Sequence, residues 1–402
     1  MNALISVDDA LTLLKQHACR PESESVPLSQ AFGQRLANPV VARTTLPPSD
    51  VSSMDGYAVR LEDVRQAGAT LKLVGEVAAG AIPPRSIDPG ETMRIFTGAA
   101  VPNGADHILI QEEARPSENT IEVLVDQAPA GYIRKAGIDF SEGDLLVRAG
   151  SILGPAELAI AAASNHRELM IVRPQRVAII AGGNELRPPG SDLQPGQVIN
   201  SVSTALSALV RCWGGHPIEV GIAKDEVGSI RQLIEAAHDA DIIVPVGGAS
   251  VGDHDHTKAA FLDAGAEFVF SKIAVKPGKP TWFARLGEKS VLGLPGNPAS
   301  AYVCAHLFLR PMMTPPSEAT TPFTAKLEAA IPANGMRETF LRAQTVKTKS
   351  GVCVTALPNQ DSSLLHPFLV ADCLVRRQAG APAAFPGDIV DCVPLSVTAT
   401  GA

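Results

Sequence analysis

One pattern constrains the fold of this chain more than any other: from residue 174 onward, apolar strands, glycine-rich turns and amphipathic helices alternate. Alternation of this kind predicts a mostly parallel sheet with helices on both faces, which is a three-layer α/β domain. We predict strands over 177–180, 218–223, 241–246, 267–275 and 289–294, and helices over 200–212, 226–240, 255–264 and 298–310.

The rest of the 402 residues carries other patterns, and a chain of this length is expected to form several domains. Residues 6–18 and 151–167 have helical patterns, the first opening on a Ser6/Asp9 capping-box spacing. Short β runs broken by proline and glycine lie between them, so pairing of the two helices would make this β-rich region an insertion. Alternating runs from 320 onward predict a small β-barrel or sandwich.

The overall charge excludes some classes of partner. With 34 basic and 42 acidic residues the net charge is −8, so no basic field attracts nucleic acid or an anionic membrane. Asp8 and Asp9 stand where a signal peptide would be apolar, and no apolar run is long enough to span a bilayer. Six cysteines without a CxxC pair argue against a disulfide framework or a structural zinc site. We expect a soluble cytoplasmic protein with reduced thiols.

Three glycine turns follow predicted strands, at 181–186, 247–255 and 294–300. Because the carboxyl ends of parallel strands meet at one edge of the sheet, we expect these turns to converge there. Glycine permits close approach of the backbone to an oxyanion, so the three turns together suit a ligand that carries phosphate. None of them matches a dinucleotide or P-loop fingerprint.

Charged side chains beside these turns have both structural and functional interpretations. Asp253 and Asp255 precede a predicted helix and are explained by helix capping, or by a divalent cation such as magnesium. The adjacent histidines lack a third ligand for zinc. Lys272, Lys276 and Lys279 are explained by simple surface charge, or by an anion clamp held on turns that prolines stiffen.

Five segments, in this order and spacing, carry a family resemblance: SSMDGYAVR (52–60), RIFTGAAVP (94–102), GGASVGDHD (247–255), AVKPGKP (274–280) and GLPGNP (293–298). Together they resemble the MoeA and gephyrin E-domain family of molybdopterin molybdenumtransferases. The resemblance covers nearly the whole chain. It implies an elongated N-terminal helical domain, discontinuous over 1–45 and 141–172, an inserted β-rich domain over 46–140, a molybdopterin-binding α/β domain over 173–316, and a C-terminal β-barrel over 320–402.

The resemblance also implies a reaction. Molybdate is inserted into the dithiolene of adenylylated molybdopterin and AMP is released, with magnesium or a similar divalent ion assisting. It implies a homodimer in which the inserted domain of one subunit completes the cleft of the other, and the adenylylating enzyme of the same pathway as a further partner.

Motif by motif, the resemblance implies a set of site residues. Those with catalytic roles are Asp55, Glu185, Asp225, Asp255, Lys272 and Lys276. Those that bind the molybdopterin substrate are Thr97, Asp139, Gly247, Gly248, Ser250, Lys279, Pro295, Gly296, Asn297, Pro298 and Ser362, with Ser363 as the alternative to Ser362. Glu185, Asp253 and Asp255 would hold the metal.

Two motifs depart from the family pattern. The usual Thr-Gly-Asp-Glu-Leu turn is here Gly182-Gly183-Asn184-Glu185-Leu186, and the usual Gln-Gly-Ser is Gln360-Asp361-Ser362. Both changes reduce the local capacity for a metal or an anion. Two other functions stay open: a non-catalytic scaffold of the same fold, and a paralogue that loads tungstate or serves one dedicated molybdoenzyme. Retention of the acidic residues and lysines argues against the scaffold.

Overall fold

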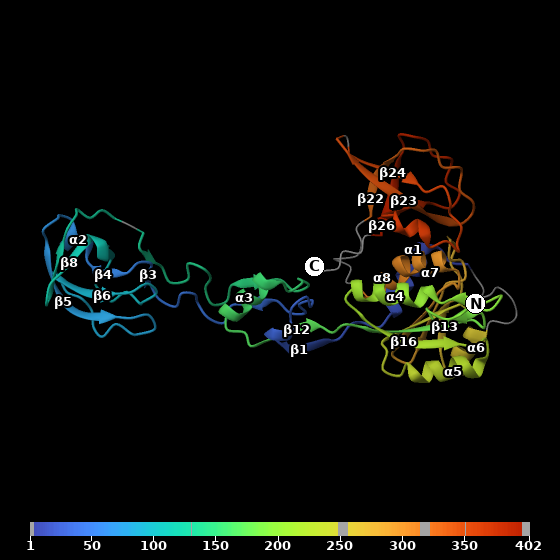
Figure 1. The fold of residues 1–402 in the computed structure, drawn as a ribbon, viewed down its shortest axis with the longest axis horizontal. Helices are drawn as coiled ribbons and strands as arrows, with labels where there is room; N and C mark the ends of the chain where they lie inside the picture. The colour runs from blue at the N-terminus through green and yellow to red at the C-terminus, as the bar shows by residue number, and fades with distance from the viewer. Residues whose placement is uncertain (1–3, 130, 248–255, 314–321, 350, 396–402) are drawn as a thin grey trace. The chain divides into compact units, whose positions relative to one another are not determined.

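The computed structural model describes residues 4–129, 131–247, 256–313, 322–349 and 351–395, and the chain forms two compact units (Figure 1). Unit 1 contains the described residues of Met1–Ser23 and Val172–Ala402, and unit 2 contains those of Glu24–Ile171. Among the described helices, none is long and apolar enough to cross a bilayer.

A six-stranded sheet forms the centre of unit 1. All its strands are parallel except β20, which runs antiparallel to both neighbours. In sheet order they are β16 (His216–Ala223), β13 (Arg176–Gly182), β17 (Ile242–Val246), β21 (Lys289–Gly293), β20 (Trp282–Leu286) and β18 (Glu267–Phe270). The predicted, mostly parallel sheet is confirmed.

Helices cover both faces of this sheet, because successive strand side chains point to opposite faces. Val177 and Ile179 face a core shared with α1 (Val7–His17), α4 (Ser201–Cys212), α7 (Pro298–Cys304) and the π-helical η3 (Ala305–Leu309). Ala178 and Ile180 face a second core with α5 (Val227–Ala236) and α6 (His256–Asp263); Figure 1 shows α5 below the strands. The three-layer α/β domain is therefore confirmed.

The first helix lies in this α/β body. Ser6 accepts a hydrogen bond from the Asp9 N–H (3.0 Å), so the predicted cap is present. Val7, Ala10 and Leu14 are buried in the core that α4 and α8 (Arg310–Met313) also line. The pairing of this helix with residues 151–167 is wrong, because its apolar stripe packs on the larger apolar surface of the α/β domain.

The predicted strand over 267–275 is broken into two pieces. β18 ends at Phe270, and the backbone N–H of Ile273 donates to the Lys279 carbonyl oxygen (3.1 Å), which turns the chain away from the sheet. The second piece, β19 (Val275–Lys276), pairs in parallel with β23 (Glu338–Thr348) of the C-terminal sheet. This break places the KPGKP segment at the boundary between the α/β domain and the C-terminal sheet.

The C-terminal strands close into a barrel, as predicted. β23 pairs with both β24 (Gly351–Ala356) and β25 (Cys373–Arg377), which completes a ring of five strands around a buried core. The other two strands are β22 (Phe323–Leu327) and β26 (Ile389–Pro394). The apolar run near 362–372 forms only the short 3-10 helix η5 (His366–Leu369), with Pro367 in its first turn, where proline is tolerated.

Unit 2 is mainly β structure. A six-stranded half-barrel sheet has the order β7 (His107–Ile110), β4 (Gly56–Val59), β6 (Glu91–Ile95), β5 (Thr70–Val77), β9 (Thr120–Val123) and β8 (Ala114–Pro116). Tyr57 and Val59 face one core and Ala58 faces another, so both faces of this sheet are covered. Two short helices, α2 (Leu61–Val64) and η2 (Gln111–Glu113), accompany it.

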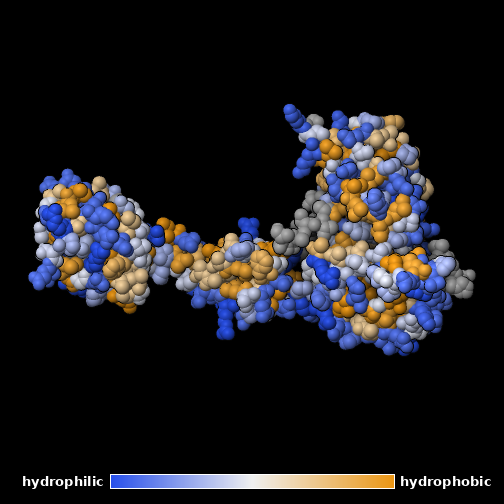
Figure 2. Space-filling model, viewed as in Figure 1, coloured by the Kyte–Doolittle hydropathy of each residue, from blue (hydrophilic) through white to orange (hydrophobic). Residues whose placement is uncertain are grey.

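The remainder of unit 2 consists of two-stranded ribbons. They pair β1 (Ser23–Pro27) with β12 (Glu168–Val172), β11 (Leu145–Val147) with β2 (Val40–Val41), and β10 (Ile133–Arg134) with β3 (Val51–Ser52). The helices described here are α3 (Pro155–Ala163) and the short η1 (Leu28–Gln30). The alanine-rich surface of α3 gives the pale orange area around it in Figure 2. The helical character predicted for the N-terminal domain is not confirmed.

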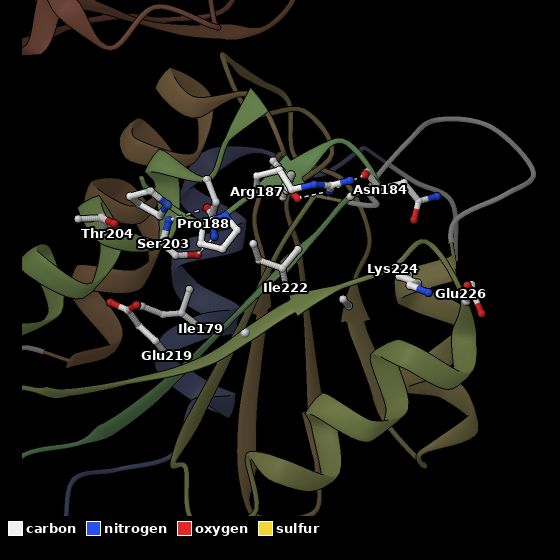
Figure 3. A pocket seen from close by; sticks show the side chains of 16 residues that line it. Ile179, Asn184, Arg187, Pro188, Ser203, Thr204, Glu219, Ile222, Lys224 and Glu226 are labelled. Carbon is white, nitrogen blue, oxygen red and sulfur yellow. Dashed lines mark hydrogen bonds between the residues drawn. The ribbon is translucent and has the colours of Figure 1, made fainter. Parts of the chain in front are cut away.

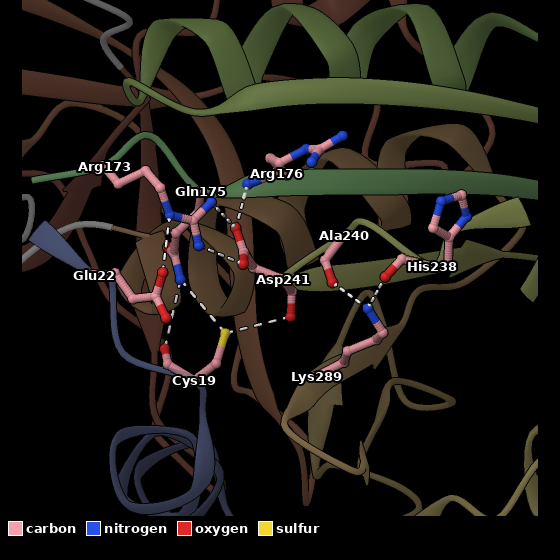
Figure 4. A network of polar contacts seen from close by, with 9 residues as sticks. All are labelled: Cys19, Glu22, Arg173, Gln175, Arg176, His238, Ala240, Asp241 and Lys289. Carbon is pink, nitrogen blue, oxygen red and sulfur yellow. Dashed lines mark hydrogen bonds and ion pairs between the residues drawn. The ribbon is translucent and has the colours of Figure 1, made fainter. Parts of the chain in front are cut away.

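A polar network fastens the amino ends of the unit 1 strands (Figure 4). The Asp241 carboxylate, just before β17, accepts hydrogen bonds from the Arg173 guanidinium (2.8 Å) and from the Arg176 backbone N–H (2.7 Å). Cys19 Sγ donates to the Asp241 carbonyl oxygen (3.4 Å), and Lys289 Nζ donates to the Ala240 carbonyl oxygen (2.9 Å). Hydrogen bonds thus join four segments that are distant in the sequence, near residues 19, 173–176, 240–241 and 289. The carboxyl edge of the sheet, at the opposite ends of the strands, takes no part in this network.

Candidate functional site

The turns 181–186 and 294–300 meet at the carboxyl edge of the sheet, together with Gly247, the one described residue of the turn 247–255. β17 and β21 remain paired into their turns, since the Leu294 N–H donates to the Pro245 carbonyl (2.8 Å) and the Gly247 N–H donates to the Leu294 carbonyl (3.2 Å). A Cβ on Gly247 would lie 2.5 Å from the Gly182 carbonyl oxygen, and one on Gly296 would lie 3.3 Å from Gly247 Cα. Such close approach requires glycine at the centre of the edge.

These turns border a hollow of about 820 Å³, which we call the edge hollow. Seven of the predicted site residues line it: Glu185, Asp225, Gly247, Pro295, Gly296, Asn297 and Pro298. The ribbon of β14 (Leu186–Arg187) and β15 (Val198–Ile199) forms part of its wall, together with Asn200, His256 and Ser363. Of the ten predicted α/β site residues that the structure describes, seven therefore lie around one cavity.

The substituted turn at 182–186 has its own internal support. The Asn184 N–H donates to the Asp225 carboxylate (3.1 Å), and the Asp225 N–H donates to the Asn184 side-chain oxygen (3.2 Å). The Glu185 carboxylate folds back so closely that a Cβ on Gly183, at φ +152°, would meet it at 2.7 Å. Asn184 thus positions one of the two carboxylates of the edge hollow.

A second hollow of about 380 Å³ adjoins the first, and we call it the basic hollow. Lys276 and Lys279 line it and are exposed, while Arg337 and Arg342 reach it from the barrel. Pro280, Pro295 and Asn297 line both hollows, so these residues form a shared wall. Lys272 is half-buried and, as the described residues lie, lines neither hollow.

The barrel loop that carries the two candidate serines contacts this wall. Asn297 Nδ2 donates to Ser362 Oγ (3.0 Å), and the Ser362 carbonyl accepts from the Ala299 N–H (3.0 Å) at the start of α7. Ser362 lines the basic hollow, whereas Ser363 lines the edge hollow. Hydrogen bonds from the Ser363 hydroxyl (2.6 Å) and N–H lower the pKa of the Asp361 carboxyl, and Asp361 itself lines neither hollow.

Several predicted residues lie outside the described part of the chain: Gly248, Ser250, Asp253 and Asp255. Their predicted roles at the glycine turn and the metal therefore stay predictions. In the described residues, no group of three His, Cys, Asp or Glu side chains is arranged to hold a metal ion. The edge hollow nevertheless presents the Glu185 and Asp225 carboxylates, and oxygen donors of this kind fit magnesium.

Three other predicted residues belong to unit 2. Asp55 Oδ1 accepts hydrogen bonds from the Thr97 backbone N–H (2.8 Å) and from the Thr97 hydroxyl (2.9 Å), and these bonds lower the Asp55 pKa. Gly56 begins β4, and its Cβ would lie 2.1 Å from the Leu109 carbonyl oxygen. Asp139 is exposed, and its N–H donates to the Leu46 carbonyl (3.1 Å). Asp55 and Thr97 are thus a hydrogen-bonded pair, and Asp139 is held separately by its own backbone hydrogen bond.

Sequence reasoning missed the two barrel arginines. Arg337 and Arg342 flank the four residues ETFL (338–341) at the start of β23, and only pairing of β19 with β23 brings them beside the lysines. An arginine next to the apolar pair Phe340-Leu341, in TFLRAQ, was the available signal.

A third hollow, of about 890 Å³, follows the edge strand β16 (Figure 3). Ile179 and Ile222 line its middle, and Glu219 lies at one end while Lys224 and Glu226 lie at the other. None of the predicted site residues lines it, so we assign it no part in the site.

Comparisons with known proteins identify the family. Three family models match: the MoeA N-terminal region (domains I and II) over 5–164, a probable molybdopterin binding domain over 178–315, and the MoeA C-terminal region (domain IV) over 324–395. The solved structure of a molybdopterin biosynthesis MoeA protein from Pyrococcus horikoshii has a TM-score of 0.83 at 29% identity, covering 98% of this chain and 100% of that one.

Curated relatives agree. A molybdopterin molybdenumtransferase of Nostoc sp. is 38% identical over 300 residues, which is 73% of this chain and 69% of that protein. Molybdopterin molybdenumtransferase 2 of Mycobacterium tuberculosis is 39% identical over 308 residues, covering 73% and 75%. A Staphylococcus aureus molybdopterin molybdenumtransferase is 28% identical over 401 residues, covering 97% and 95%. The chain belongs to the MoeA family of molybdopterin molybdenumtransferases.

Proposed function

We propose that this protein is a molybdopterin molybdenumtransferase, which inserts molybdate into adenylylated molybdopterin and releases AMP in molybdenum cofactor biosynthesis. The observation that carries the proposal is the pair of adjoining hollows. One is lined by glycine turns and carboxylates, the other by four cationic side chains, and Pro280, Pro295 and Asn297 separate them. A reaction between a phosphate-bearing molecule and a small dianion needs two such compartments side by side.

The basic hollow suits molybdate, a compact tetrahedral dianion. Lys276 and Lys279 provide mobile positive charge, and Arg337, whose Nη1 donates to the Val275 carbonyl (3.5 Å), is held beside them. Charged donors make the stronger hydrogen bonds to an oxyanion, and the side-chain amide of Asn297 adds a neutral donor in the shared wall. These groups would concentrate molybdate next to the dithiolene without reacting themselves.

The edge hollow suits the adenylylated substrate. Its backbone approaches closely at Gly247 and Gly296, where phosphate oxygens could lie against N–H groups. Glu185 and Asp225, with Asp253 and Asp255 from outside the described residues, would hold magnesium. When bound, magnesium neutralises phosphate charge and so favours departure of AMP.

We further propose a cytoplasmic homodimer in which unit 2 of one subunit completes the site of the other, with the adenylylating enzyme as donor of the substrate. Asp55 supports this arrangement, because it carries an exposed carboxylate fixed by Thr97 yet belongs to a different unit from both hollows.

The test is release of AMP. Purified protein, adenylylated molybdopterin, magnesium and molybdate should yield AMP and a metal-bound dithiolene, and omission of molybdate should reduce both. Lys276→Ala should raise the molybdate KM about tenfold, as loss of one charged contact predicts, while the melting temperature stays unchanged because Lys276 is exposed.

The outcomes separate the alternatives. Neither AMP nor bound metal from the intact protein would favour the non-catalytic scaffold. Faster turnover with tungstate than with molybdate would identify the tungstate-loading paralogue. An unchanged molybdate KM in Lys276→Ala would remove the lysine from the anion site.

A further inference from the structure

We infer that Arg342 is a positioning residue: it holds the barrel loop 359–364 in the shape that sets Ser362 against the start of α7, and so fixes the wall between the two hollows. The inference rests on the proposed function for its effect on activity. The geometry that carries it is independent of that function.

Arg342 is committed to this loop. Its side chain is 2% exposed, and its guanidinium donates to three carbonyl oxygens of the loop, those of Leu364 (3.0 Å), Asn359 (3.2 Å) and Asp361 (3.0 Å). The guanidinium carbon lies 5.4 Å from the centre of the Phe368 ring, just beyond the loop. Unlike Lys276 and Lys279, this cation uses its donors inside the protein.

Gln360 adds further hydrogen bonds between the loop and Arg342, and we call this whole set of bonds the latch. Its Oε1 accepts from the Arg342 backbone N–H (3.0 Å) and from Arg342 Nε (3.3 Å), and its Nε2 donates to the Arg342 carbonyl (2.9 Å). Side chain and backbone of Arg342 are therefore both joined to the same loop. No single bond determines the loop, so its conformation is over-specified.

The far side of the loop is where this conformation matters. The Ser362 carbonyl accepts from the N–H groups of Ala299 (3.0 Å) and Ser300 (3.3 Å), and its hydroxyl accepts from Asn297 (3.0 Å). The first turn of a helix leaves its N–H groups without partners within the helix, so a loop from another domain supplies them here. Arg342 lines the basic hollow, but its side-chain donors are bonded to the loop, so it acts on the shared wall through Ser362.

Only an arginine fits this role. Its planar fork presents five N–H donors in fixed directions, whereas a lysine offers a single ammonium at the end of a flexible chain. Three carbonyls and one amide oxygen, spread over residues 359–364, cannot be reached from one ammonium position. Arg342→Lys therefore retains the charge and removes the positioning.

The first experiment measures kinetics of AMP release. Arg342→Lys should raise the molybdate KM about tenfold, the effect expected for losing a hydrogen bond to a charged group, with kcat changed much less. The matched control is Arg376→Lys, an arginine of the neighbouring strand β25 that pairs with Glu338 and Asp8 and should leave the KM unchanged. Equal KM changes in both variants would mean general damage to the barrel and would overturn the inference.

A double-mutant cycle identifies the route. If Arg342 acts through Ser362, Ser362→Ala and Arg342→Lys together should raise the molybdate KM no more than the larger single effect. Additive effects would overturn the inference. Gln360→Ala, which weakens the latch and retains the buried arginine, gives a milder version of the same test should Arg342→Lys fold poorly.

A second readout needs no activity. Hydrogen exchange at the Ala299 and Ser300 amides should become faster in Arg342→Lys and in Gln360→Ala, because their acceptor would no longer be held in place. Unchanged exchange would overturn the positioning role even in an active protein. Faster exchange in a protein that releases no AMP would instead uphold it and reject the proposed function.

Discussion

At the scale of single residues, the KPGKP segment depends on one glycine. Gly278 has φ +114°, and a Cβ there would lie 2.1 Å from the Cys304 sulfur. Thr281 Oγ1 lies 2.8 Å from the Gly278 carbonyl oxygen and 3.3 Å from Cys304 Sγ. Burial raises the Cys304 pKa to about 12, so the group beneath the loop remains a neutral thiol. Packing on α7 therefore fixes the loop that presents Lys276 and Lys279.

Gly278→Ala should lower the free energy of unfolding by about 1–3 kcal/mol, since it combines a disfavoured φ with a steric overlap. It should also raise the molybdate KM, because both lysines leave their positions. Chemical denaturation and AMP-release kinetics measure the two effects.

Gly287→Ala separates the two causes, because Gly287 also has positive φ (+59°) but no atom within 4 Å of its Cβ position. A double variant, Gly278→Ala with Cys304→Ala, should recover part of the lost activity by removing the overlapping sulfur. Wild-type kinetics in Gly278→Ala would show that the lysines do not depend on this packing.

Residue types in the sequence indicated which positions matter, but they did not indicate the structural reason for each residue. Asp55-Gly56 has the signature of a tight turn, yet Gly56 lies in strand β4 and is glycine because β7 passes too close for a side chain. That contact joins segments about fifty residues apart, and no local pattern encodes it. The lysine cluster was predicted because its members are neighbours in sequence, whereas Arg337 and Arg342 required the fold.

At the scale of elements, η3 interrupts the helix predicted over 298–310. His306 lies in this π-helical segment, 4% exposed, with Nδ1 3.0 Å from the Tyr302 carbonyl oxygen and its ring 5.3 Å from Trp213, edge to face. Burial lowers the His306 pKa to about 4. The segment is therefore built around a neutral imidazole.

Acid should destabilise unit 1 through this histidine. Its pKa is about 6.5 in the unfolded chain and about 4 in the folded one, so between these values the unfolded state binds more protons. The free energy of unfolding should consequently fall as pH falls through that window, by on the order of 3 kcal/mol in full. Denaturant titrations at pH 7, 6 and 5 measure this slope.

His306→Phe keeps a ring against Trp213 and removes the titration, so its unfolding free energy should depend less on pH over the same range. His238→Phe is the control, because that side chain is 76% exposed. If the His306 variant kept the full wild-type pH slope, another group would be responsible.

Hydrophobic periodicity predicted the strands whose own sequence is enough to place them in the buried sheet. β13, β17 and β21 are largely buried between the two cores, and their apolar runs show it, whereas the edge strand β16 is apolar only in part and keeps Glu219 exposed. The sequence did not predict β20, an antiparallel strand inside a parallel sheet, because its aromatic run TWFARL follows the KPGKP turn without a helix between them. β19 was joined to β18 because leaving one sheet for another depends on a partner, β23, more than sixty residues away.

At the scale of the whole molecule, the two hollows and the Asp55–Thr97 pair belong to different compact units. The α/β domain and the barrel could be predicted because each buries its own core. The placement of α1 could not be predicted, because its apolar stripe can pack on any sufficiently large apolar surface. The proposed contribution of Asp55 to a site, and the subunit that would make it, likewise depend on assembly and are tested by experiment.

Asp55→Asn isolates the charge of this residue. Both hydrogen bonds from Thr97 end on Oδ1, which asparagine also provides, so the loop should keep its shape while the carboxylate is lost. We expect a large loss of AMP release with an unchanged melting temperature. A purely structural Asp55 would leave the activity nearly intact.

Mixed dimers then test sharing between subunits. Each chain carries its own tag, one with Asp55→Asn and the other with Lys276→Ala, and tandem purification isolates the heterodimer. The assay uses molybdate well below the wild-type KM, where the Lys276→Ala change lowers the rate about tenfold. If Asp55 of one subunit serves the hollows of the other, one of the two sites combines both mutations and the second combines neither, so activity returns to about half of the wild-type level. If each subunit uses its own Asp55, both sites remain defective. Purified heterodimers without activity, or a protein that stays monomeric at assay concentrations, would therefore rule out a shared site.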